Sequence, residues 1–143
     1  MTQTCPISFN RVDAHLVRIV ATEVITVALL LLFTQNLLFA LLLLFDFSVR
    51  VLRLQHLSLF VFIAKTIIEQ FHIKAQPCDE APKRFALYLG VGIIALFTIF
   101  YALHFTFIAS ILVGILLICA FFEAAFDYCV GCKIYYLLQL LKK

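Results

Sequence analysis

The sequence has little charge. Only 13% of its 143 residues are Asp, Glu, Lys or Arg, and 65% are hydrophobic, whereas a soluble globular domain is about a quarter charged and about half apolar. This scarcity excludes a water-soluble surface and predicts an integral protein of the lipid bilayer. The net charge of +3 is too small, and too embedded in apolar sequence, for nucleic acid binding. The length excludes a large transporter or a multi-domain enzyme and allows a few membrane spans.

The longest run without a charged residue covers Phe85–Phe122, which is 38 residues. As one helix it would extend about 57 Å, whereas the hydrocarbon core of a bilayer is about 30 Å thick. The run is therefore predicted to fold back within Tyr101–Thr106, where His104 and two hydroxyl residues interrupt the aliphatic residues. This gives two spans, over residues 85–101 and 105–126.

A second uncharged run, Val24–Phe45, could form one span or the middle of a hairpin. A hairpin broken at Thr34–Asn36 gives spans over residues 16–33 and 37–52. Four spans then place all 11 Lys and Arg residues on one side of the membrane, whereas three spans would scatter them over both. Because basic residues collect on the cytoplasmic side, both termini are predicted to be cytoplasmic. The predicted fold is an all-α, four-helix transmembrane bundle forming one domain, residues 1–143.

The segment between the second and third spans, residues 54–73, has apolar residues at helical spacing. This pattern predicts an amphipathic helix on the inner leaflet. Pro6-x-x-Phe9 and Pro82-x-x-Phe85 precede the two hairpins at an offset of 76 residues. The offset suggests two parallel hairpin repeats, although coincidences of this size also occur in four-helix membrane proteins without repeats.

Four acidic residues fall in or at the edges of the predicted spans. A charge there costs about 2.5–3.5 kcal/mol, so each is expected to have a partner. Asp46 and Arg50 are four residues apart and can pair on one helix, whereas Glu123 and Asp127 present two acids on one face. The preferred interpretation is an ion-pair network that fixes helix packing, and a proton or ion path is the alternative. The network residues are Arg11, Asp13, Arg18, Glu23, Asp46, Arg50, Glu123 and Asp127.

Four of the five cysteines map to the predicted inner face, and Cys119 lies within a span. Cys129 and Cys132 form a C-x-x-C, whose spacing allows a disulfide bond or the chelation of one metal ion. Cys5 is a candidate third, resolving thiol. Cys5 and Cys78 together with the pair would supply four sulfurs, which is enough for a closed zinc site. Redox or sulfur exchange, metal binding and a purely structural role remain open at this point.

Three motifs are distinctive: CPISFNRVD at residues 5–13, PKRFA at 82–86 and FDYCVGC at 126–132. With them the chain resembles a bacterial four-span integral-membrane family recorded as a domain of unknown function, whose motifs read approximately CPxxFNRVD, PKRFA and FCxGC. In that pattern the aromatic residue adjoins the first cysteine, whereas Asp127-Tyr128 precedes Cys129 here. The resemblance implies a multi-pass protein of the bacterial cytoplasmic (inner) membrane, and it implies no reaction.

The leading hypothesis is a thiol–disulfide or sulfur-relay protein of the cytoplasmic face. Cys132 or Cys129 would be the attacking thiolate and Cys5 an exchange partner. A soluble thioredoxin-like or sulfurtransferase protein would be its partner, and a quinone between helices is a candidate electron acceptor. The alternatives are a non-catalytic membrane scaffold or accessory subunit, and a structural metal-binding membrane protein. Cys78 matches no part of the family pattern, which weakens the four-sulfur site. The sequence specifies no cofactor or oligomeric state.

Overall fold

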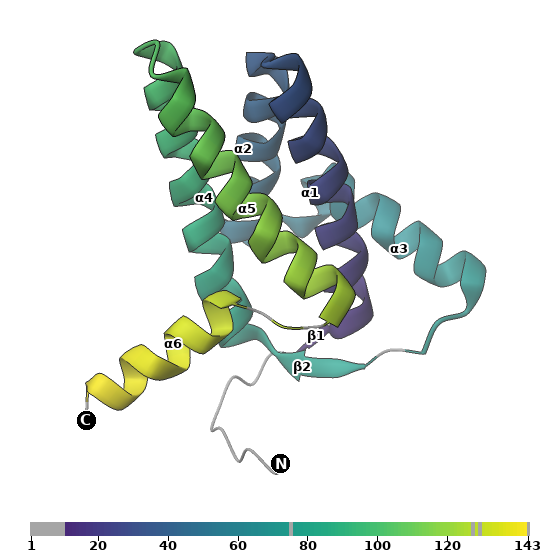
Figure 1. Ribbon diagram of the computed structural model, residues 1–143. Coiled ribbons are helices and arrows are strands. Elements are labelled where there is room, and N and C mark those ends of the chain that lie inside the picture. The colour runs from purple at the N-terminus through teal and green to yellow at the C-terminus, as the bar shows by residue number, and fades with distance from the viewer. Residues whose placement is uncertain (1–10, 75, 127, 129, 143) are drawn as a thin grey trace.

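The computed structural model describes residues 11–74, 76–126, 128 and 130–142, and for residues 11–12, 55 and 78–82 it describes the backbone alone. The helices over Ala14–Thr34, Leu37–Val51, Glu80–Ala102 and Thr106–Phe126 run side by side as a bundle, and those over Leu59–Phe71 and Val130–Leu141 project from it (Figure 1). The elements, in order, are β1 (Arg11–Asp13), α1 (Ala14–Thr34), α2 (Leu37–Val51), the 3-10 turn η1 (Gln55–Leu57), α3 (Leu59–Phe71), β2 (Pro77–Asp79), α4 (Glu80–Ala102), α5 (Thr106–Phe126) and α6 (Val130–Leu141). In the bundle, α1 contacts α2 and α5, and α4 contacts the same two helices.

Three of the described helices are apolar and long enough to cross a bilayer. They cover Ala14–Thr34, Lys83–Ala102 and Thr106–Phe126 and have 21, 20 and 21 residues, and a spanning helix needs about 20. The prediction of an all-α membrane protein is therefore confirmed. Helix α2 has 15 residues and extends about 22 Å. That α2 forms a fourth span stays a prediction, and so does the single-domain organisation.

Polar side chains form the turn between α1 and α2. Gln35 adopts a left-handed conformation with φ 51°, and its backbone N–H donates to the carbonyl of Leu31. The Asn36 side chain then accepts from the backbone N–H of Leu38 and caps the start of α2. Left-handed residues end helices and Asn begins them, so two adjacent residues reverse the chain.

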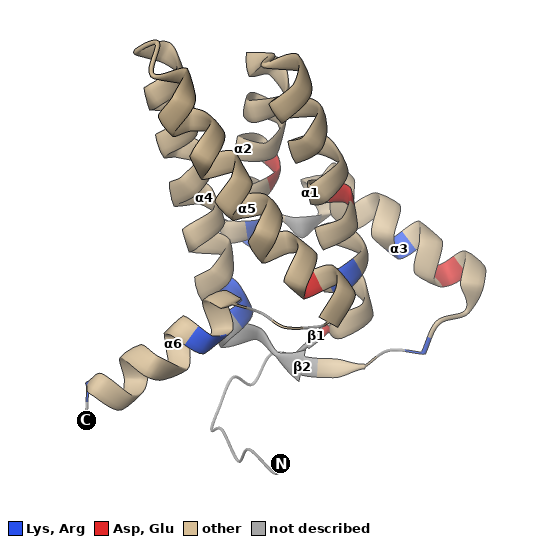
Figure 2. Ribbon diagram, viewed as in Figure 1, with Lys and Arg blue, Asp and Glu red and all other residues tan. Residues whose placement is uncertain are grey.

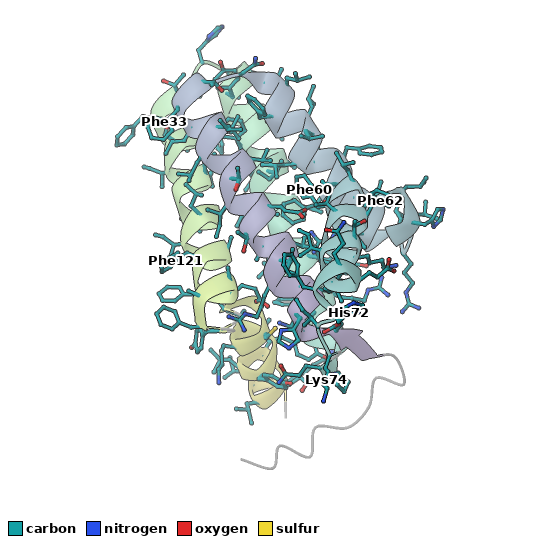
Figure 3. All side chains as sticks on the ribbon, turned by 90° about the vertical axis from the view of Figure 1, so that its right-hand side faces the viewer. Phe33, Phe60, Phe62, His72, Lys74 and Phe121 are labelled. Atoms are coloured by element: carbon teal, nitrogen blue, oxygen red, sulfur yellow. The ribbon has the colours of Figure 1, made fainter. Side chains whose placement is uncertain are left out.

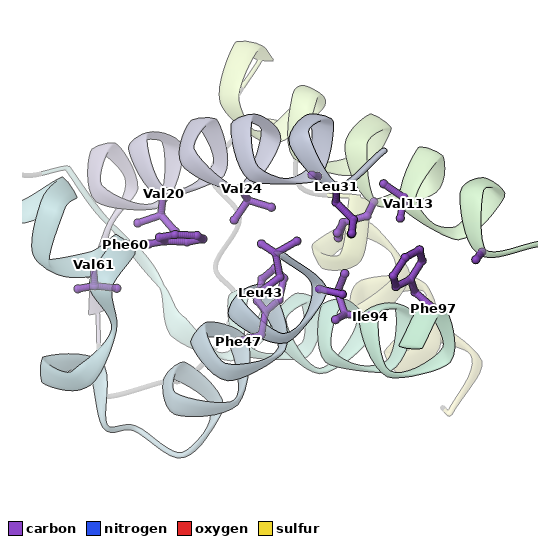
Figure 4. Packing of buried hydrophobic residues seen from close by; sticks show 14 of the residues in the cluster. Val20, Val24, Leu31, Leu43, Phe47, Phe60, Val61, Ile94, Phe97 and Val113 are labelled. Carbon is purple, nitrogen blue, oxygen red and sulfur yellow. The ribbon is translucent and has the colours of Figure 1, made fainter. Parts of the chain in front are cut away.

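The core of the bundle is made of aliphatic residues and phenylalanines. Leu31, Leu43, Ile94, Phe97 and Val113, each under 2% exposed, come from all four bundle helices and face one another (Figure 4). The alanines between them are fully buried and let the helices approach closely. Close van der Waals packing of this kind attracts helices to one another in lipid. The alanines are Ala28, Ala40 and Ala109.

Large apolar side chains also cover the outside of the bundle. Phe33 is 82% exposed and Phe107 is 79% exposed. Phe33, Phe62 and Phe121 point away from the other helices in Figure 3. Exposed apolar surface of this extent is unfavourable in water and favourable against lipid chains, which agrees with a protein that contacts the bilayer.

Charged residues gather in the half of the bundle next to β1 and β2, which we call the charged half (Figure 2). The described helix ends that adjoin the turns at residues 35–36 and 103–105 carry no charged residue. The opposite half of the bundle therefore carries no charge among the described residues, and its polar groups are hydroxyls, amides and His104. Which membrane the protein occupies, and which side of it the charged half faces, stay predictions.

Helix α3 packs against α1 through one face and leaves another apolar face uncovered. Phe60, Val61 and Ala64 are buried, whereas Phe62 and Phe71 are 66% and 72% exposed. The segment predicted as an amphipathic helix over residues 54–73 thus contains η1 and α3, and its exposed phenylalanines would be stable only against lipid or another apolar surface.

Two short strands tie the start of α1 to the start of α4. β1 and β2 pair antiparallel, with Arg11 opposite Asp79 and Asp13 opposite Pro77. The Asp13 carboxylate accepts from the backbone N–H groups of His15 at 3.0 Å and of Gln76 at 3.2 Å. Asp13 therefore caps α1 and at the same time holds the segment that leads into β2.

Candidate functional site

A buried carboxylate joins α2 to the start of α3. Asp46 is 2% exposed, accepts a short hydrogen bond from the Ser58 hydroxyl and lies 3.4 Å from Nη1 of Arg50. Ser58 also accepts from the backbone N–H of Val61 and so caps α3. The guanidinium of Arg50 lies over the Phe47 ring, 5.5 Å from its centroid. A buried charge is tolerated when it is paired and hydrogen-bonded in this way.

Three further contacts tie the helices together in the charged half. Lys83 of α4 forms an ion pair with Glu123 of α5, and both side chains are largely buried. Arg84 donates from Nη2 to the carbonyl of Val51, 3.1 Å away. Arg18 of α1 donates from Nε to the carbonyl of Ala124, 3.2 Å away. Long-range contacts of this kind restrain the relative positions of α1, α2, α4 and α5.

The structure brings together some residues of the expected ion-pair network and separates others. Asp46 and Arg50 are paired. Arg18 binds a backbone carbonyl, and Asp13 binds backbone N–H groups. The partner of Glu123 is Lys83, which the predicted network did not include although it belongs to the PKRFA motif. The side chain of Arg11 and the whole of Asp127 lie outside the described residues.

Glu23 differs from the other described acids of the charged half. Both of its carboxylate oxygens are buried, and neither has a hydrogen-bond partner among the described residues. The charges of Asp46 and Arg50 are close enough to act on it. An unsatisfied buried acceptor of this kind costs about 1–3 kcal/mol. Arg18, five residues before Glu23 on the same helix, donates instead to the carbonyl of Ala124.

The described cysteine side chains differ in their bonding. Cys132, in the first turn of α6, is disulfide-bonded, whereas Cys119 of α5 is free and half-buried. Cys5 and Cys129 lie outside the described residues, and of Cys78 only the backbone is described, opposite Val12 in the strand pair.

The first turn of α6 is held directly against α4. A β-carbon on Gly131 would lie 2.6 Å from Cβ and 2.8 Å from Cα of Ala86, so only glycine fits this approach. The rings of Phe85 and Tyr135 continue the contact, with centroids 5.7 Å apart. Gly131 belongs to the FDYCVGC motif and Ala86 to PKRFA, and β1 brings the end of CPISFNRVD to β2, just before α4. The three distinctive motifs thus meet in the charged half.

No metal site is recognisable among the described side chains, which contain no group of three or more His, Cys, Asp or Glu residues suited to hold an ion. The proposed four-sulfur site depends on Cys5, Cys78 and Cys129, whose side chains lie outside the described part. The metal-binding alternative therefore stays a prediction.

An all-helical bundle with three long apolar helices and its charges collected in one half is a helical integral membrane protein. The family model described as Domain of unknown function (DUF4395) matches residues 12–140, and the chain therefore belongs to this family. The match confirms the resemblance to a family of unknown function. No curated protein and no solved structure matches the chain.

Proposed function

We propose that this chain is a thiol–disulfide or sulfur-relay protein of the bacterial inner membrane that acts at its cytoplasmic face. Cys129 and Cys132 would be the exchanging pair, with Cys5 as a further exchange partner. The observation that carries the proposal is the disulfide bond of Cys132. Cys132 lies in a helix turn that packs closely against α4 through Gly131. A sulfur on a firmly seated turn can be presented repeatedly to a partner protein in the same position.

The orientation is argued from charge. Basic residues accumulate on the cytoplasmic side of membrane proteins, and the described Lys and Arg residues lie in the charged half, on α3 and α6, or in the segments beside them. With α2 as a fourth span, both termini would be cytoplasmic. The cytoplasm is reducing, so a disulfide exposed there persists only when an enzyme cycles it or the fold protects it. This favours reduction or sulfur transfer over the export of disulfides.

The exchange step needs a dithiol partner. A thiolate of a soluble thioredoxin-like protein attacks the disulfide of Cys132 and forms a mixed disulfide, and the partner's second thiol then displaces Cys132. The partner becomes oxidised to its disulfide, and the two cysteines of this chain are released as thiols. A sulfurtransferase would instead deliver a persulfide sulfur to one of these thiolates, which would pass it on.

A scaffold or accessory subunit is the second candidate, and the buried polar contacts favour it. The Asp46–Ser58 contact joins α2 to the start of α3, and the Lys83–Glu123 pair joins α4 to α5. If the cysteines serve this purpose as well, their disulfide would stabilise the start of α6 without turnover.

Mass-shift alkylation of the full-length protein across a series of thiol redox buffers separates the two candidates. The relay predicts a reversible transition of two thiols within the cytoplasmic range of potentials, which the Cys129→Ser, Cys132→Ser double variant loses while it stays folded. A scaffold predicts that the double variant loses thermal stability or assembly. Cys119→Ser is the matched control, because Cys119 is free, and it should leave the transition unchanged.

Topology is tested separately by labelling intact cells with a membrane-impermeant thiol reagent. Cys129 and Cys132 should react only after the cells are permeabilised and the disulfide is reduced. Labelling in intact, reduced cells would put these cysteines on the outer face and would contradict the proposed function.

A further inference from the structure

A cavity of about 410 Å³ lies between α1, α2, α4, α5 and α6. Its walls are apolar over most of their area and include Val20 and Ala21 of α1, Gly90 and Ile93 of α4, and Leu116 and Ala120 of α5. Val20 and Phe47, which also line it, are visible in Figure 4. The volume falls in the range of about 300–1,000 Å³ that is usual for small-molecule sites.

The polar part of the lining is mainly basic. Arg50, Lys83 and Arg84 contribute three positive charges, and Glu123 contributes one negative charge. Asp46, which is paired with Arg50 just outside the lining, contributes a second negative charge, so this group of five residues keeps a net positive charge. Lys83 directs its ammonium to Glu123, and Arg50 directs Nη1 to Asp46. An ammonium has three N–H donors and a guanidinium has five, so both groups retain donors for a further acceptor.

We propose that this cavity binds one membrane lipid with an anionic head group. An acyl chain would occupy the apolar walls, because an apolar void inside a membrane protein forfeits dispersion contacts that a lipid chain restores. A phosphate would bind near Arg50, Lys83 and Arg84 through charge-assisted hydrogen bonds. Basic pockets between transmembrane helices are the usual site of such head groups. The proposal is independent of the thiol chemistry.

The position of the cavity gives the lipid a structural consequence. Val130, Gly131 and Ile134 of α6 form part of the lining, and this turn carries Cys132. A bound chain would therefore contact this turn beside Ala86, which also lines the cavity. Loss of the lipid should loosen α6 before it affects the bundle.

The experiment uses full-length protein in nanodiscs that contain a photoactivatable diazirine acyl chain on either phosphatidylglycerol or phosphatidylcholine. Cross-linked residues are mapped by mass spectrometry. The anionic lipid should label Ala21 and Ala120 more than the zwitterionic lipid does, by roughly fivefold for each basic residue engaged. Ile118 and Phe121 are 58% and 55% exposed on the outside of α5, so both lipids should label them equally.

Two pairs of variants extend the test. Ala120→Phe narrows the cavity and should reduce labelling at Ala21, whereas Ala125→Phe, at an exposed position of the same helix, should not. Arg84→Gln should reduce the preference for the anionic lipid, whereas Lys65→Gln on the exposed side of α3 should not. If Ala120→Phe does not fold, the Arg84→Gln comparison decides the matter. Equal labelling of Ala21 and Ala120 by both lipids, or a preference that Arg84→Gln leaves unchanged, would overturn the proposal.

Discussion

Gly131 and Ala86 lie so close that a methyl group added to Gly131 would be 2.6 Å from the methyl group of Ala86. Helix α6 therefore touches α4 backbone to backbone at its first turn, and any larger residue must push the two helices apart. The position of Cys132, one residue further along, depends on this contact.

Gly131→Ala is expected to lower the stability of the protein by about 1–3 kcal/mol, because overpacking at the contact of α6 with α4 forces the backbone to move. Thermal unfolding of the purified protein measures the loss, and faster reduction and alkylation of Cys132 should accompany it. Gly114→Ala is the control, since a β-carbon there meets no atom within 4 Å. That change should be neutral or stabilise the protein by up to about 1 kcal/mol, because alanine favours helix. Equal effects at the two glycines would contradict the close contact.

Removing one partner of the Lys83–Glu123 pair should lower the stability of the protein more than removing both charges. Lys83→Met leaves the Glu123 carboxylate largely buried without its cation, which is expected to cost about 3 kcal/mol. The Lys83→Met, Glu123→Gln double variant removes both charges and should be more stable than Lys83→Met alone. A double-mutant cycle on the free energy of unfolding gives the coupling. Additive effects would mean that the two side chains do not interact.

Asp46→Asn should destabilise the junction of α2 and α3. The amide cannot replace the carboxylate as partner of both Ser58 and Arg50, and hydrogen bonds to charged groups contribute about 1.5–3 kcal/mol. Hydrogen exchange should increase at the start of α3 more than elsewhere, because Ser58 caps that helix. Exchange that rises equally along α4 and α5 would show that Asp46 acts on the whole bundle instead.

Glu23→Gln is expected to be neutral or to stabilise the protein by about 1 kcal/mol. The carboxylate oxygens are buried without a partner among the described residues, and the neutral amide is less costly to bury and no longer repels Asp46. Glu69→Gln on the exposed side of α3 is the control and should change stability by less than about 0.5 kcal/mol. A loss of more than about 1 kcal/mol at Glu23 would indicate a partner that stabilises its charge.

Local features of the fold were predictable from sequence, and long-range ones were not. The pairing of Asp46 with Arg50 follows from helix geometry, since residues four apart share a face. The contact of Lys83 with Glu123 joins residues 40 apart, and nothing in either segment specifies the other. The β1–β2 pairing has only three residues in each strand, which is too short for alternation of apolar and polar residues to be recognised.

The candidate site was predictable to a similar degree. The C-x-x-C spacing indicates that Cys132 could form a disulfide bond, and in the structure Cys132 is disulfide-bonded. The role of Gly131 was not predictable, because a glycine required by a close helix approach looks the same in sequence as any other glycine. The requirement comes from Ala86, which is 45 residues away and on another helix. The same holds for the unsatisfied carboxylate of Glu23. Arg18, on the same helix, binds the carbonyl of Ala124 instead, and that contact depends on the packing of α1 against α5.

The shortness of α2 has a consequence for the surrounding lipid. With 15 residues against 21 in α1, α2 is about 9 Å shorter along its axis. If α2 is the predicted fourth span, the hydrophobic belt of the protein is narrower on that side, and the bilayer would have to thin locally or admit head groups toward Asp46 and Ser58. Hydrophobic mismatch of this kind sorts proteins between membranes of different thickness, so the protein should insert more stably, and with less lipid distortion, into bilayers with shorter acyl chains.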